Sequence, residues 1–252
     1  MLEVRNLTKV FPTGTRALND LSVTIPDGQF VVVIGLSGSG KSTFLRCVNR
    51  LVEPTSGRVL LNGEDVTAAG SERLRQIRGQ IGMIFQQFNL IRRESVLTNV
   101  LTGALGTANE PASLMGRWPK DEVERALFNL ERVGIAEKAR QRADTLSGGQ
   151  QQRVAIARTL MQRPRLLLAD EPVASLDPAT SHSVMRYVEQ INKEDGITVI
   201  CNLHFLSLAR RYAQRVLALK DGELVADLEP HAIDPHKFRE IYGEDAVEVE
   251  VA

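Results

Sequence analysis

Residues 35–43 read Gly-Leu-Ser-Gly-Ser-Gly-Lys-Ser-Thr and match the pattern G-x-x-x-x-G-K-[S/T] at every fixed position. The apolar run Phe30–Ile34 precedes this stretch, and apolar residues recur at helical spacing between Thr43 and Leu51. A strand, a glycine-rich loop and a helix in this order are typical of a phosphate-binding P-loop. The sequence therefore predicts that a nucleotide lies on this loop.

Each part of the loop has a physical task. The glycines allow backbone N–H groups to turn toward an anion, and a helix beginning near Lys41 adds the positive end of its dipole. Lys41 can reach the β- and γ-phosphates, and the Ser42 hydroxyl can ligate Mg²⁺. The residues expected to bind the nucleotide here are Gly35, Ser37, Gly38, Ser39, Gly40, Lys41, Ser42 and Thr43.

Composition narrows the class of protein. The chain has 252 residues, with 31 basic and 31 acidic side chains, and this neutral balance argues against a nucleic-acid partner. No apolar run in the sequence is long enough to span a bilayer, and from the first residues we expect no signal peptide. Cys47 and Cys201 stand alone, which is typical of buried thiols in a reducing compartment. We expect a cytoplasmic protein.

The order of secondary-structure signals predicts an α/β fold. Residues 2–25 carry β patterns, and strands alternate with helices up to residue 90 and again from residue 165. Such alternation favours parallel strand pairing. We expect a P-loop NTPase with a mainly parallel sheet, β structure at the N-terminus and a helical insertion.

The insertion shows helical periodicity over residues 94–106 and 119–141, with a loop expected between them. The last residues alternate acidic and apolar types, as a loosely ordered tail does. The expected organisation is a single domain over 1–243, with its core at 1–90 and 161–243, a helical subdomain at about 91–160, and a flexible tail at 244–252.

A second chemical centre follows the apolar run Leu166–Ala169. Asp170, at the end of this expected strand, can hold Mg²⁺, and Glu171 can act as the general base for the water that attacks the γ-phosphate. The alternative is a pair of solvated carboxylates, which the P-loop makes the weaker interpretation.

A third motif lies at Leu146–Gln150. Ser147 can cap the helix that follows, and the two glycines expose N–H groups at its N-terminus, which makes a second anion site. A nucleotide on the first loop could reach this site only after a large rearrangement, so the motif points to a phosphate supplied by another subunit. The residues expected to bind it are Ser147, Gly148, Gly149 and Gln150.

Leu146–Gln150 also matches completely the signature motif of the ATPase subunits of ATP-binding-cassette (ABC) transporters, which the chain resembles over about residues 2–243. The resemblance implies a RecA-like core with an N-terminal antiparallel β subdomain. It also implies roles for four further residues. Gln86 would sense the γ-phosphate and ligate the metal, and His204 would contact the γ-phosphate. Asp177 would lie in the loop that crosses a dimer interface, and Phe11 would stack on adenine.

The resemblance also implies a mechanism and partners. Two copies would pair head to tail, with each ATP held between Lys41 of one subunit and Ser147 of the other. ATP with Mg²⁺ would close the dimer, and hydrolysis would reopen it. The movement would pass through the Gln86 region to transmembrane permease subunits and indirectly to a substrate-binding protein. The chain would lie peripherally on the cytoplasmic face of the inner membrane.

Two stretches test these assignments. The run Asn202-Leu203-His204-Phe205 departs from the family, in which threonine commonly precedes the histidine and aspartate follows it. Because His204 is retained, we expect activity. Asn192–Asp195 matches a guanine-reading motif but ends a helical pattern, so ATP remains the expected nucleotide.

Phe85–Leu90 and Ala169–Pro178 are similar to the ATPase subunits of phosphonate importers, and the Leu203-His204 pair fits that group. Phosphite and phosphate-ester importers are close relatives, and amino-acid or methionine importers are the next alternative. A non-transport ABC ATPase or a P-loop kinase is less consistent with the chain. The former usually carries two cassettes or a coiled coil, and a kinase would lack Leu146–Gln150.

Overall fold

The computed structural model describes residues 1–106, 117–233 and 235–243. The N-terminal part forms a four-stranded antiparallel sheet in the order β2-β1-β4-β5. Its inward-facing residues alternate with exposed ones, as expected for strands with one buried face. This confirms the predicted N-terminal antiparallel β structure. The strands are β1 (Leu2–Val10), β2 (Arg16–Ile25), β4 (Ser56–Leu61) and β5 (Glu64–Asp65).

The second sheet has six strands in the order β10-β9-β3-β8-β7-β6 and is parallel except for the pairing of β10 with β9. Every residue of β3, β7 and β8 is buried, because helices or the other sheet cover both faces. The strands are β3 (Phe30–Ile34), β6 (Ile81–Ile84), β7 (Leu166–Asp170), β8 (Thr198–Asn202), β9 (Arg215–Lys220) and β10 (Glu223–Leu228).

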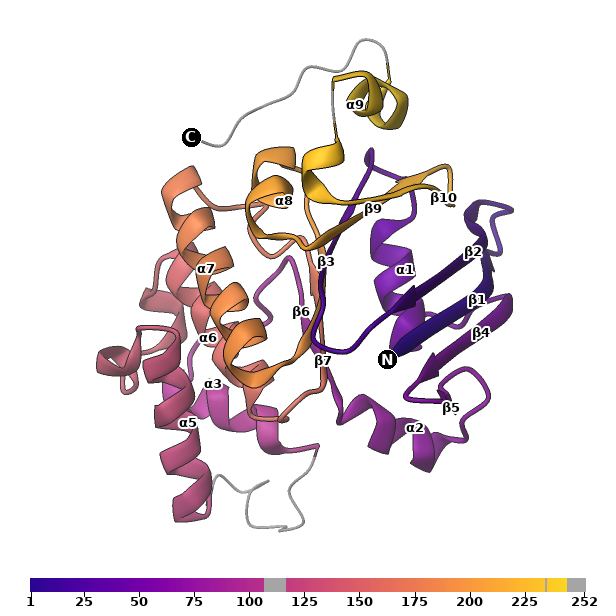
Figure 1. Ribbon diagram of the computed structural model, residues 1–252. Helices are drawn as coiled ribbons and strands as arrows, with labels where there is room; N and C mark the ends of the chain where they lie inside the picture. The colour runs from indigo at the N-terminus through magenta and orange to yellow at the C-terminus, as the bar shows by residue number, and fades with distance from the viewer. Residues whose placement is uncertain (107–116, 234, 244–252) are drawn as a thin grey trace.

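Helices lie on both sides of this sheet. Helix α1 lies between the two sheets, and α3, α5, α6 and α7 gather on the opposite face (Figure 1). The α-helices are α1 (Lys41–Val48), α2 (Ser71–Arg78), α3 (Val96–Leu101), α5 (Lys120–Arg132), α6 (Gly148–Leu160), α7 (Pro178–Asp195), α8 (Leu206–Tyr212) and α9 (Pro235–Tyr242). The short 3-10 helices are η1 (Thr102–Ala104), η2 (Ala136–Lys138), η3 (Ala143–Thr145) and η4 (Pro230–Ala232).

Two predicted helices differ in extent. The helix predicted over 119–141 ends at Arg132, because Gly134 takes a left-handed conformation with φ 64° and breaks the helix before η2. The pattern over 94–106 contains α3 and then η1. Helices α3, α5 and α6 lie between β6 and β7 in the chain, where the sequence predicts a helical insertion. The division of the chain into a core and a helical subdomain stays a prediction.

Residues 107–116 of the predicted loop and the predicted tail, 244–252, fall outside the described residues. Cys47 and Cys201 are buried free thiols, as predicted, and burial raises the pKa of both, that of Cys47 to about 12. Within the described ranges, no helix combines the length and the apolar character needed to cross a bilayer.

Candidate nucleotide-binding site

The loop between β3 and α1 requires its glycines. Gly35 has φ 141° and Gly40 has φ 102°, a region that L side chains rarely adopt. A Cβ atom on Gly35 would lie 2.1 Å from the Leu219 carbonyl oxygen, and one on Gly40 would lie 2.3 Å from that of Ala17. The loop therefore fits tightly against its neighbours and begins α1 at Lys41, as the sequence predicts.

Lys41 is held inside this loop. Its Nζ donates to the carbonyl oxygens of Gly35, at 2.7 Å, and Leu36, at 2.9 Å, and the residue is 4% exposed. Burial lowers the pKa of Lys41, whereas the nearby charges of Glu171 and Asp170 act in the opposite direction. The loop thus presents an ammonium group, together with the N-terminus of α1, to an anion.

A hydrogen-bond network joins Asp170, at the end of β7, to α1 and β8. Its Oδ1 accepts from Ser42 Oγ at 2.7 Å and from Asn202 Nδ2 at 3.0 Å, and its Oδ2 accepts from Arg46 at 3.1 Å. Arg46 and Asn202 are not among the site residues predicted from the sequence. Asn202 could have been found from the parallel strand register, which pairs it with Asp170.

Glu171 and His204 meet just beyond the same strand ends. His204 Nε2 lies 2.6 Å from Glu171 Oε1, and the side chains are 35% and 15% exposed respectively. Glu171 has φ 53°, a left-handed conformation that costs on the order of 1–3 kcal/mol in a residue other than glycine. The chain therefore turns sharply after Asp170 and presents the Glu171 carboxylate to the imidazole.

Lys41, Glu171 and His204 line one cavity of about 240 Å³, whereas the buried Asp170 is not among its lining residues. The P-loop, the residue that follows β7 and the segment after β8 all contribute to its lining, although they are distant in sequence. The lining residues are Ala17, Ser37, Gly38, Gly40, Lys41, Ser42, Thr43, Glu171 and His204. A triphosphate placed on the loop would thus face both a carboxylate and an imidazole.

Several predicted residues do not line this cavity. Phe11 is half-buried, with Lys9 Nζ 5.1 Å from the centre of its ring, and Gln86 is exposed beyond β6. Ser39 is buried, and its Oγ has no hydrogen-bond partner among the described residues. The predicted roles of Phe11 and Gln86 therefore stay predictions.

Residues 146–150 lie outside the lining of this cavity. The predicted cap of α6 is confirmed, because Gln150 N donates to Ser147 Oγ at 3.4 Å, and Ser147 N donates to Gln150 Oε1 at 3.0 Å. Gly149 approaches α7 so closely that a Cβ atom would lie 2.1 Å from Thr180 Cγ2. Asp177 caps α7 by accepting from Thr180 N at 3.0 Å, and hydrogen bonds from the side chain and the backbone of Thr180 lower the pKa of its carboxyl.

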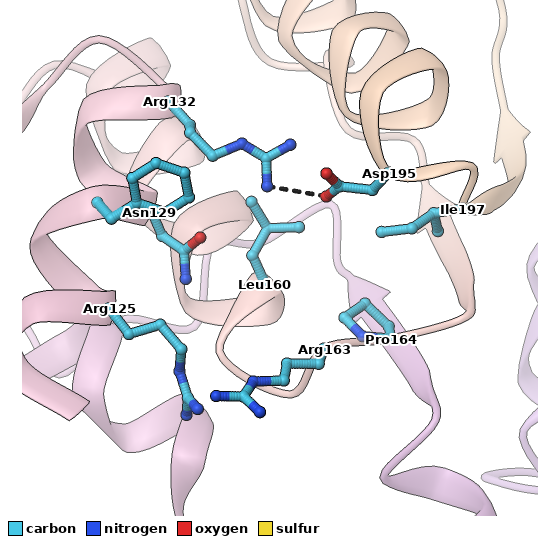
Figure 2. Close-up of a pocket in the computed structure, with 9 residues that line it drawn as sticks. Arg125, Asn129, Arg132, Leu160, Arg163, Pro164, Asp195 and Ile197 are labelled. Carbon is cyan, nitrogen blue, oxygen red and sulfur yellow. Dashed lines mark hydrogen bonds and ion pairs between the residues drawn. The ribbon is translucent and has the colours of Figure 1, made fainter. Parts of the chain in front are cut away.

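A pocket of about 300 Å³ lies between α5 and the beginnings of β7 and β8, at the opposite strand ends from Asp170 (Figure 2). Arg132 donates to Asp195 at 2.8 Å across it, and Arg125 pairs with Glu122. It contains none of the predicted site residues, and carboxylates already neutralise two of its three arginines. Volume alone therefore does not identify the nucleotide site.

Comparisons of the sequence with known proteins assign a family to the chain. The family model described as ABC transporter matches residues 18–174. The phosphonates import ATP-binding protein PhnC of Bdellovibrio bacteriovorus is 57% identical over 250 residues, covering 99% of this chain and 96% of that protein. Phosphonates import ATP-binding protein PhnC 3 of Halalkalibacterium halodurans is 53% identical over 243 residues, covering 96% and 94% respectively.

Solved structures show the same fold. A dimeric ATP-binding cassette in a post-hydrolysis state, bound to ADP and Pi, is 35% identical with a TM-score of 0.81, covering 91% of this chain and 99% of that one. CbiO1 from Clostridium perfringens, part of the ABC transporter complex cbiONQ, is 30% identical with a TM-score of 0.82, covering 95% and 92% respectively. This chain therefore belongs to the ATP-binding subunits of ABC transporters.

Proposed function

We propose that this chain hydrolyses ATP to drive the import of phosphonates, or of phosphite or phosphate esters, through membrane partners. The observation that carries the proposal is the 57% identity to a phosphonates import ATP-binding protein along 99% of the chain. The cavity that joins the P-loop to Glu171 and His204 supports the hydrolytic part. The substrate assignment rests on the relatives, because the described cavity recognises nucleotide.

In this mechanism Glu171 is the general base. Its carboxylate accepts a proton from the water that attacks the γ-phosphorus, and the bond from that phosphorus to the bridging oxygen breaks. His204, 2.6 Å from Glu171, orients the carboxylate and contacts the γ-phosphate. Lys41 stabilises the charge that develops on the phosphate oxygens, and Gln86 approaches the γ-phosphate from beyond β6.

Mg²⁺ fits the oxygen donors of this site. The Ser42 hydroxyl and the Asp170 carboxylate lie 2.7 Å apart at the end of the sheet, and both are ligand types that Mg²⁺ prefers. Ser42 and Asp170 would hold the ion, with Gln86 as the third predicted ligand. When bound, Mg²⁺ neutralises charge on the β- and γ-phosphates.

The second half of the site comes from another copy of the chain. Residues 147–150 and Asp177 do not line the P-loop cavity of their own chain, so a partner would present them to the nucleotide. A head-to-tail pair with twofold symmetry supplies this arrangement twice and closes on itself. The dimeric state of the solved relative bound to ADP and Pi supports this part of the proposal. Phe11 would stack on the adenine.

The transport partners lie outside this chain. Transmembrane permease subunits provide the pathway, and a substrate-binding protein delivers the phosphonate to them. The ATPase subunit attaches peripherally at the cytoplasmic face of the inner membrane. The chain needs no nucleic acid, in keeping with its balance of 31 basic and 31 acidic side chains.

The test is reconstitution of the subunit with the permease that co-purifies with it, followed by ATPase assays with the binding protein. We expect binding protein loaded with a phosphonate, phosphite or phosphate ester to stimulate hydrolysis, whereas binding protein offered methionine should not. Hydrolysis that no phosphorus compound stimulates would remove the substrate assignment. A chain that hydrolyses no ATP in any preparation would contradict the whole proposal.

A further inference from the structure

Asn202 occupies an unusual position for a polar residue. It is the last residue of β8, is 0% exposed, and lies in parallel register opposite Asp170, the last residue of β7. Its Nδ2 donates to Asp170 Oδ1 at 3.0 Å. The backbone pairing therefore brings this amide to the carboxylate whenever the sheet forms.

The other end of this amide lacks a partner. Asn202 Oδ1 is buried and has no hydrogen-bond partner in the described part of the chain. An amide oxygen left unpaired in a protein interior opposes folding, and an apolar side chain of the same shape would avoid that cost. Stability alone therefore does not explain why asparagine occupies this position, and the role of the residue lies in the hydrogen bond that its Nδ2 makes.

That bond restricts the Asp170 carboxylate. Oδ1 receives two donors, Ser42 Oγ and Asn202 Nδ2, while Arg46 donates to Oδ2. A carboxylate held on both oxygens cannot rotate freely when a cation approaches. We propose that Asn202 is a positioning residue that fixes the Asp170 carboxylate for the Mg²⁺-bound nucleotide, an inference that rests on the proposed function.

The same strand end orients a second pair. Two residues after Asn202, His204 reaches Glu171, which directly follows Asp170. The ends of β7 and β8 are thus joined by two side-chain contacts, at 3.0 and 2.6 Å. Loss of the first contact should change the response to Mg²⁺ most and the maximal turnover less, because Glu171 and His204 keep their own contact.

The test uses Asn202→Leu, which resembles asparagine in shape, and Asn202→Ala, which guards against misfolding by an overpacked leucine. The affinity for a fluorescent ATP analogue is measured with EDTA and with Mg²⁺, alongside the Mg²⁺ concentration that gives half-maximal hydrolysis. In EDTA, both variants should bind the analogue as tightly as the wild type does. Mg²⁺ should increase the affinity of the wild type but not that of the variants. The Mg²⁺ concentration that gives half-maximal hydrolysis should be about 10-fold higher or more in the variants. Outer partners of metal ligands typically contribute about 10–100-fold to metal affinity.

Asn192→Ser is the matched control. Asn192 is also a buried asparagine, 3% exposed, but its Nδ2 donates to the carbonyl oxygens of Gly28 and Ile197, away from the cavity. This variant should melt at a lower temperature and keep the wild-type response to Mg²⁺.

Wild-type Mg²⁺ dependence in Asn202→Leu and Asn202→Ala would overturn the inference. So would failure of both to fold under conditions in which Asn192→Ser is folded, because Asn202 would then be structural. If the wild-type protein neither binds nor hydrolyses ATP, the proposed function fails instead, and that result is visible before any variant is made.

Discussion

The P-loop and the loop at 146–150 both present backbone N–H groups at the beginning of a helix, but their surroundings differ. Around the P-loop, Lys41, Glu171 and His204 line one cavity within a single chain. At the second loop, Ser147 and Gln150 form hydrogen bonds with each other in a capping box, and neither residue lines that cavity. Helix N-termini alone therefore do not make an active site here. The first loop lies among the side chains that we propose as catalytic, whereas the second begins at the exposed Ser147, outside that cavity.

The largest effect should come from the cation of the first loop. Lys41→Ala should lower ATP hydrolysis by about 10²–10³-fold or more, because the developing phosphate charge loses its buried ammonium partner. Steady-state phosphate release measures the effect. Lys193→Ala, at an exposed lysine paired with Glu189 on α7, should keep wild-type turnover. Equal turnover in Lys41→Ala and the wild type would remove Lys41 from the mechanism.

Glu171→Gln should separate binding from chemistry at the same cavity. The amide keeps the shape of the side chain but cannot accept the proton of the attacking water, so hydrolysis should fall by about 10²–10⁴-fold. Binding of a fluorescent ATP analogue should stay within a few-fold of the wild type. Glu189→Gln makes the same chemical change on α7 and should have no effect on turnover. A Glu171→Gln protein that hydrolyses ATP normally would assign the base elsewhere.

The second loop offers a sharper comparison through two substitutions of one residue. Aspartate and asparagine both cap helices well, so Ser147→Asp and Ser147→Asn should each preserve α6 and the melting temperature. Only aspartate adds a negative charge where the partner's triphosphate is expected. Ser147→Asp should therefore lower hydrolysis by about 10-fold or more relative to Ser147→Asn. Similar turnover in the two variants would mean that no phosphate approaches this loop.

The smallest effect concerns the cap of α7 beside the second loop. Hydrogen bonds from Thr180 and the backbone lower the pKa of Asp177, so the ionised carboxylate is favoured in the folded state. Its stabilising contribution is present above the unfolded pKa of about 3.9 and is lost as the pH falls through the lower folded value. Asp177→Asn keeps a cap without the charge. Its melting temperature should therefore fall less than that of the wild type between pH 5 and pH 3.

Local patterns predicted most of the fold. The P-loop, the apolar strand before Asp170 and the cap at Ser147 each depend on neighbouring residues, and the structure places all three as predicted. The predicted end of α5 was wrong because the helical periodicity of the sequence continues past Gly134. The left-handed backbone of Gly134 ends the helix earlier. Arg46 and Asn202 were missed because their contacts with Asp170 depend on tertiary packing and strand register. A single chain likewise leaves the roles of Phe11, Gln86 and Asp177 as predictions.

The central claim is that the P-loop of one chain and residues 147–150 of a second copy together form the nucleotide site. Its most direct test is the molar mass of Glu171→Gln in solution, measured by light scattering after size exclusion. We predict a monomer without nucleotide and a dimer with ATP and Mg²⁺, because the variant binds ATP without hydrolysing it. The same variant carrying Ser147→Asp should stay monomeric, and the one carrying Ser147→Asn should dimerise. A Glu171→Gln protein that binds ATP yet remains monomeric at high concentration would contradict the account.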